Sequence, residues 1–202
     1  MKTIKQIFTV SLLVVFMLGC FSVKAQKNNP YNSFGVKVVK SVNLVLKDYN
    51  EGKVKNIDKE TLDYYSKKLN LDPISVEFAS TIVKKVKNEN LAGVISNSKY
   101  SIFTKNTLTN AFNLNIDAFS DLVNSIKSNK LNEKEKIFLL KAVSMVYNFK
   151  IHNNHQNTSR FICADSPSAC GAGIGSIIGA AIGGGPGMLI GAIIGGLVGS
   201  VS

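Results

Sequence analysis

The last 32 residues of the chain carry a glycine at every fourth position without interruption. On a helix, a period of four places these glycines on one face and leaves there a groove free of side chains. The opposite face is a ridge of Ile, Leu and Val, and no charged side chain follows Asp165. The periodic glycines are Gly171, Gly175, Gly179, Gly183, Gly187, Gly191, Gly195 and Gly199.

This pattern predicts close helix packing in an apolar setting. Each glycine costs about 1 kcal/mol relative to alanine in a helix, so helix propensity does not explain the repeat. Near its midpoint, Gly184, Gly185 and Pro186 predict a turn, because proline removes a backbone donor and glycine permits any turn geometry. We therefore expect a hairpin of two arms, about 171–183 and 187–201. Their glycine faces would pack together while the ridges face lipid.

The repeat resembles the glycine-zipper segments of bacterial envelope proteins, including small outer-membrane surface antigens with paired glycine-zipper helices. It is also similar to the Gly-rich membrane-active part of some bacteriocins. Both resemblances cover residues 171–202 only, and they imply a lipid bilayer as partner and self-association through the glycine face. The chain departs from both groups. The envelope antigens usually carry the zipper nearer the N-terminus, and many bacteriocins begin with a double-glycine leader.

Residues 1–25 have the features of a secretory signal peptide: a basic start, a short apolar core at 7–18 and small residues before a cleavage site after Ala25. A second interpretation stays open, because residues 17–20 resemble a bacterial lipobox in which Cys20 would be lipidated. Both interpretations predict an exported protein, either in the cell envelope (periplasmic or associated with the outer membrane) or secreted.

The exported chain would be basic. Removal of residues 1–25 takes away three lysines and leaves 21 basic and 13 acidic residues, a net charge of +8. Lysines close to an anionic lipid surface contribute about 1 kcal/mol each to binding, although lysines scattered among acids also simply keep a domain soluble. Nucleic acid is not an expected partner, because the chain is exported and no basic patch is interleaved with aromatic residues.

Two cysteines remain in the exported chain, Cys163 and Cys170. In an oxidising compartment we expect them to form a disulfide that closes a small loop in the linker 151–170. The nearby His152 and His155 lie in an Asn-rich stretch that indicates a solvated linker. They do not supply the four ligands that a structural metal site needs, so neither a metal nor another cofactor is predicted.

Between a polar lead at 26–33 and the linker, residues 34–150 show apolar positions at helical spacing and few strand signals, which predicts an all-α domain of five or six helices. Asp72 followed by proline predicts a helix start, Asn115 or a neighbour should cap the helix around Phe119, and Asn132 to Glu135 match a capping box.

No nucleophile elbow, zinc-binding helix, redox pair or phosphate-binding loop occurs in the sequence, so we expect a protein that is not an enzyme. Three functions fit these features. The first is an exported envelope protein anchored or oligomerised in a membrane by the C-terminal hairpin. The second is a secreted, bacteriocin-like toxin that inserts the hairpin. The third is a self-assembling surface component.

Overall fold

The computed structural model describes residues 28–54, 56–152 and 167–201, and every regular element in these ranges is a helix, as the sequence predicts. The predictions for the signal peptide, Cys20, His155 and Cys163 concern residues outside these ranges. The helices are α2 (Asn32–Asn50), α3 (Lys59–Lys68), α4 (Val76–Asn88), α5 (Leu91–Asn97), α6 (Ile102–Asn113), the 3-10 helix η1 (Ile116–Ala118), α7 (Phe119–Ser128), α8 (Glu133–His152) and α10 (Pro167–Val201).

Side chains cap several of these helices as the sequence predicts. The backbone N–H of Glu135 donates to Asn132 Oδ1 at 2.9 Å, and Asn132 Nδ2 donates back to Glu135 Oε2 at 3.1 Å. The first bond confirms Asn132 as the cap of α8, whereas in the second bond Glu135 accepts from the Asn132 side chain and not from its backbone N–H as in a standard capping box. The carboxylate of Asp58 accepts from the N–H of Thr61 at 2.9 Å and begins α3 in the same manner.

Two predicted helix starts are wrong. Helix α4 does not begin at Asp72, because the hydroxyl of Ser75 accepts from the N–H of Phe78 at 3.1 Å and makes Ser75 the N-cap. The proline after Asp72 lies in the connection that delivers Ile74 to the core. Asn115 makes no side-chain cap bond; it precedes η1, whose tight turn leads directly into α7.

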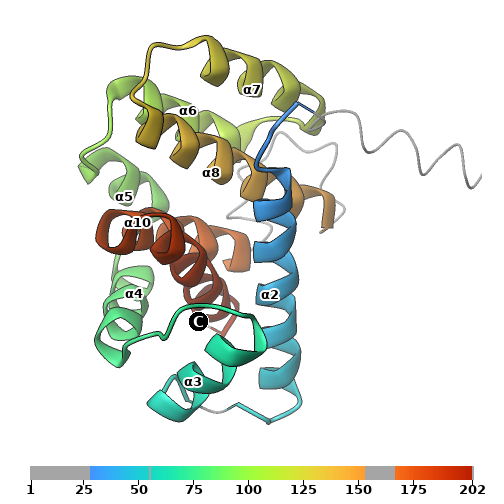
Figure 1. Cartoon of the computed structure of the whole chain (residues 1–202), viewed down its shortest axis with the longest axis vertical. Helices are drawn as coiled ribbons and strands as arrows, with labels where there is room; N and C mark the ends of the chain where they lie inside the picture. Colours follow the sequence, from blue (N-terminus) through green and yellow to red (C-terminus); the bar gives the residue numbers. More distant parts are fainter. Residues whose placement is uncertain (1–27, 55, 153–166, 202) are drawn as a thin grey trace, which may run out of the picture.

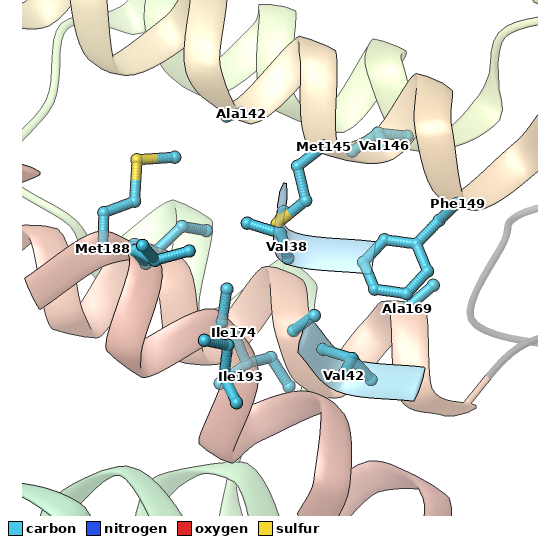
Figure 2. Close-up of a cluster of buried hydrophobic side chains, with 14 of the residues drawn as sticks. Val38, Val42, Ala142, Met145, Val146, Phe149, Ala169, Ile174, Met188 and Ile193 are labelled. Carbon is cyan, nitrogen blue, oxygen red and sulfur yellow. The ribbon is translucent and has the colours of Figure 1, made fainter. Parts of the chain in front are cut away.

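Helix α10 lies in the middle of the molecule and contacts α2, α4, α5 and α8 (Figure 1). In the view of Figure 1, α2 and α4 flank it on either side and α8 crosses above it. Helix α8 is buried on nearly every side, with Leu139, Val143 and Phe149 in the core. Side chains of α2, α8 and α10 meet in one apolar cluster that contains Val42, Met145 and Ile174 (Figure 2). The C-terminal segment is therefore part of the core.

Candidate functional site

Helix α10 consists of two helical arms joined by a glycine turn. The backbone is non-helical at Gly183 (φ −123°, ψ 15°) and at Gly184 (φ 60°, ψ −140°). The Gly184 conformation is one that residues with a Cβ rarely adopt. The turn thus lies at Gly183 and Gly184, while Gly185 and Pro186 begin the second arm. A proline in the first turn of a helix loses no intrahelical hydrogen bond.

The first arm also begins earlier than the sequence suggests. Residues Pro167 to Cys170 are helical and belong to α10, and α8 extends to His152. His152 Nε2 lies 2.7 Å from Asn43 Nδ2 of α2, which attaches the end of α8 to α2. Cys170 is therefore in the first arm. Because Cys163 lies outside the described residues, its pairing with Cys170 stays a prediction.

The two arms approach to backbone contact through their periodic glycines. A Cβ added to Gly175 would collide with the carbonyl oxygen of Gly191 and lie 3.1 Å from the Cα of Gly195. A Cβ on Gly179 would similarly collide with the carbonyl of Gly187. The same relation holds between Gly171 and Gly195, and between Gly199 and the carbonyl of Pro167. These pairs are symmetric about residue 183, so one antiparallel register brings seven of the eight periodic glycines into contact.

The ridges opposite the glycine face are buried within the protein. Ile174 and Ile177 of the first arm and Ile190, Ile193 and Leu197 of the second are all buried. The sequence predicts that these ridges face lipid; in this structure α2, α3, α4, α5 and α8 cover them instead. The physical reason is the hydrophobic effect, because in water a hairpin without charges is stable only when its apolar face is covered.

Two further glycines, which do not belong to the four-residue period, allow neighbouring helices to lie close to the hairpin. A Cβ on Gly196 would lie 2.9 Å from Cγ2 of Val42 in α2. A Cβ on Gly173 would lie 2.7 Å from Cζ of Phe112 in α6. Glycines therefore allow close contact both between the two arms and between the hairpin and the helices that surround it. We call these surrounding helices, α2 to α8, the cover.

The tip of the hairpin is the one long stretch of α10 that is exposed. Residues 181–186 are exposed and uncharged, and the side chain of Ile182 is 56% exposed. The Lys141 ammonium lies 3.3 Å from where a Cβ on Gly185 would be. It also lies 5.5 Å and 5.3 Å from the ring centroids of Tyr31 and Phe34. An apolar apex beside lysine and aromatic side chains is typical of groups that occupy a membrane–water interface.

Helix α3 covers part of the second arm and is attached to α2 by Asp48. The Asp48 carboxylate, whose side chain is 5% exposed, accepts from Lys68 Nζ at 2.8 Å and from the Tyr65 hydroxyl at 3.0 Å. The Lys68 hydrogen bond lowers the pKa of Asp48 below its ordinary value of 3.8 against the opposing effect of burial. Burial and the same carboxylate raise the pKa of Tyr65. The charges stabilise one another while α3 is in place.

By length and composition, residues 167–200 could cross a membrane, but 61% of the most apolar window is buried inside the protein, as in the core helix of a soluble protein. Within the described ranges, no group of three His, Cys, Asp or Glu side chains is placed to hold a metal ion. Comparisons of the chain with protein families, curated proteins and solved structures give no match.

Proposed function

We propose that this chain is an exported, non-enzymatic, membrane-active protein that stores an apolar hairpin in a soluble helical cover and inserts it into a lipid bilayer. The observation that carries the proposal is that some side chains of α10 are fully buried while others are exposed to solvent. The ridges along both arms are buried, whereas the uncharged tip around Ile182 is open to solvent.

The arrangement supports release of the hairpin more than permanent anchoring. A constitutive anchor presents its apolar ridge to lipid from the outset, whereas here the ridge is occupied by the protein's own helices. Because the arms contact each other through backbone, the hairpin retains its internal packing when the covering helices leave. Lipid can then replace those helices at the ridge with little loss of apolar burial.

The tip provides the first contact with the bilayer. Ile182 enters the interface without the cost of transferring a charge, and Lys141 meets anionic head groups beside it. The other basic residues of the exported chain, which has a net charge of +8 once residues 1–25 are removed, increase the attraction to an anionic surface before any insertion occurs.

Dye-loaded vesicles containing anionic lipid provide the test. The purified protein should release the dye, and Ile182→Asp should reduce the rate of release about tenfold or more, because Asp costs up to about 3 kcal/mol in hydrocarbon. The matched control is Ile102→Asp, since Ile102 of α6 is 79% exposed and far from the tip in sequence. It should leave release unchanged.

The remaining outcomes separate the other functions. Protein that resists an alkaline wash but leaves the vesicles sealed is an anchor. Detergent-resistant ladders without membrane association indicate self-assembly. A folded protein that neither binds nor permeabilises vesicles would make α10 a core hairpin of a soluble protein and would contradict the proposal.

A further inference from the structure

A cleft of about 400 Å³ opens where the second arm of α10 ends. Its walls are the end of α2 with the chain that follows it, one side of α4, and Leu197 and Val198 of α10. Leu197 follows the turn at Gly184 by 13 residues, which places it about 20 Å along the arm from the tip. The cleft and the tip are therefore at opposite ends of the hairpin.

The floor of the cleft is aliphatic. Val54 comes from the chain after α2, Val83 from α4, and Leu197 and Val198 from the hairpin. The volume lies within the range of about 300–1,000 Å³ that is typical of sites for small molecules. An apolar hollow of this size that opens to water favours occupation by an apolar group.

The mouth of the cleft is positively charged. Lys84 and Lys87 line it from α4, and their spacing of three residues places both on one side of that helix. Both are exposed, and neither forms an ion pair with any carboxylate of the described residues. Their neighbour Lys85, by contrast, pairs with Glu89 at 2.6 Å. The mouth is thus suited to an anion.

A second apolar hollow adjoins the cleft beneath α3. It has a volume of about 30 Å³, shares Ile57 and Leu197 with the cleft and is also lined by aliphatic side chains, among them Val45, Leu62 and Ile190. The aliphatic surroundings on both sides of Ile57 and Leu197 favour a ligand with a long apolar chain over a compact anion.

We propose that the cleft binds one long-chain fatty acid, with the carboxylate between Lys84 and Lys87 and the acyl chain over Val54, Val83 and Leu197. The site is asymmetric in the same way as the ligand, because lysines line its mouth and aliphatic side chains line its floor. This site does not depend on membrane insertion by the tip.

Titration calorimetry with palmitate, below its aggregation concentration, tests the site. Wild-type protein should bind one equivalent, and Lys84→Ala/Lys87→Ala should weaken binding roughly tenfold or more. The control Lys37→Ala/Lys40→Ala removes two exposed lysines of the same spacing from α2 that do not line the cleft, and it should bind palmitate normally. Val83→Trp keeps both charges but fills the cleft, and it should abolish binding with an unchanged circular dichroism spectrum.

Two other probes identify the ligand class. Hexadecanol has a similar chain without the charge and should bind as weakly to wild-type protein as palmitate binds to the double lysine variant. Acetate and inorganic phosphate should not compete. The site would be refuted by equal palmitate affinity in the two double variants, by absence of binding, or by competition from either small anion. Dye release from vesicles should be the same for wild-type protein and Val83→Trp, so failure here is separable from failure of the proposed function.

Discussion

The hairpin and its helical cover are both helical, but they are stabilised in opposite ways. The cover is built from helices that pack through side chains, and α3 and α4, for example, are capped and carry polar groups on their outer faces. The arms of α10 pack backbone on backbone, have no charges, and place glycine where the cover places Val, Leu or Phe. The cover is suited to water, whereas the hairpin is soluble only while it is covered.

Glycine substitutions should therefore break the hairpin in a position-dependent way, and this is the largest effect that we expect. Gly191→Leu places a side chain against the carbonyl of Gly175 and should lower the free energy of unfolding by more than about 4 kcal/mol, or prevent folding. Gly183→Leu is the matched control, because a Cβ on Gly183 meets no atom within 4 Å. Denaturant unfolding of both variants measures the difference. Equal destabilisation would mean that the glycine period does not mark the contact between the arms.

The ridge should respond like an ordinary protein core. Ile193 is buried between the second arm and its cover, so Ile193→Ala should cost about 2–5 kcal/mol of unfolding free energy. The exposed Ile182 gives the comparison, and Ile182→Ala should change stability by less than about 0.5 kcal/mol. Thermal unfolding separates the two. A small effect at Ile193 would indicate that the ridge is not held by the cover in solution.

The turn should show which glycine determines the register. Gly184 has φ 60°, so Gly184→Ala should cost about 1–3 kcal/mol from backbone strain alone. Gly185→Ala is the control, since the nearest atom to its Cβ would be the flexible Lys141 ammonium at 3.3 Å. Chemical denaturation should rank Gly184→Ala well below Gly185→Ala in stability. The reverse order would place the turn one residue later, where the sequence alone suggests it.

The sequence predicts the helices and the contact between the arms, but it does not predict what covers the hairpin. Helical spacing and the capping signal at Asn132 are local, and they predict the all-α class of the cover, although the described residues form seven α-helices and η1 before α10 where five or six helices were expected. The glycine period likewise predicts two arms in contact. What covers the ridge is not encoded locally, since an Ile, Leu and Val face is equally suited to lipid and to the interior of a protein. Only the tertiary arrangement distinguishes them.

The cleft was beyond sequence analysis for the same reason. Lys84 and Lys87 are two lysines among many, and nothing in their spacing separates them from a solvated helix face. They become notable only when Val54 and Leu197, which are distant in the sequence, form an apolar floor beside them. Cap prediction also failed at α4: Ser75, three residues after the predicted Asp72, is the N-cap, and the proline after Asp72 lies in the preceding connection.

The smallest effect on stability is expected at Asp48, whose carboxylate attaches α3 to α2 and so holds α3 over the second arm of the hairpin. The pKa of Asp48 is lowered in the folded protein, so its contribution to stability is present above the unfolded value of 3.8 and is lost as the pH falls through the lower folded value. Asp48→Asn should therefore be less stable than wild type at neutral pH, and the difference should disappear in strong acid.

Hydrogen exchange at neutral pH should show where that loss acts. In Asp48→Asn, the amides of α3 should exchange faster while those of α8 stay protected, because the carboxylate accepts from Tyr65 and Lys68 of α3 but from no group of α8 among its observed hydrogen bonds and ion pairs. Lys68→Met completes a double-mutant cycle with Asp48→Asn. The loss of stability in the double variant should be smaller than the sum of the losses in the two single variants. Uniform exchange throughout the protein would mean that the cover opens as a whole, and that α3 is not the part of it that first uncovers the hairpin.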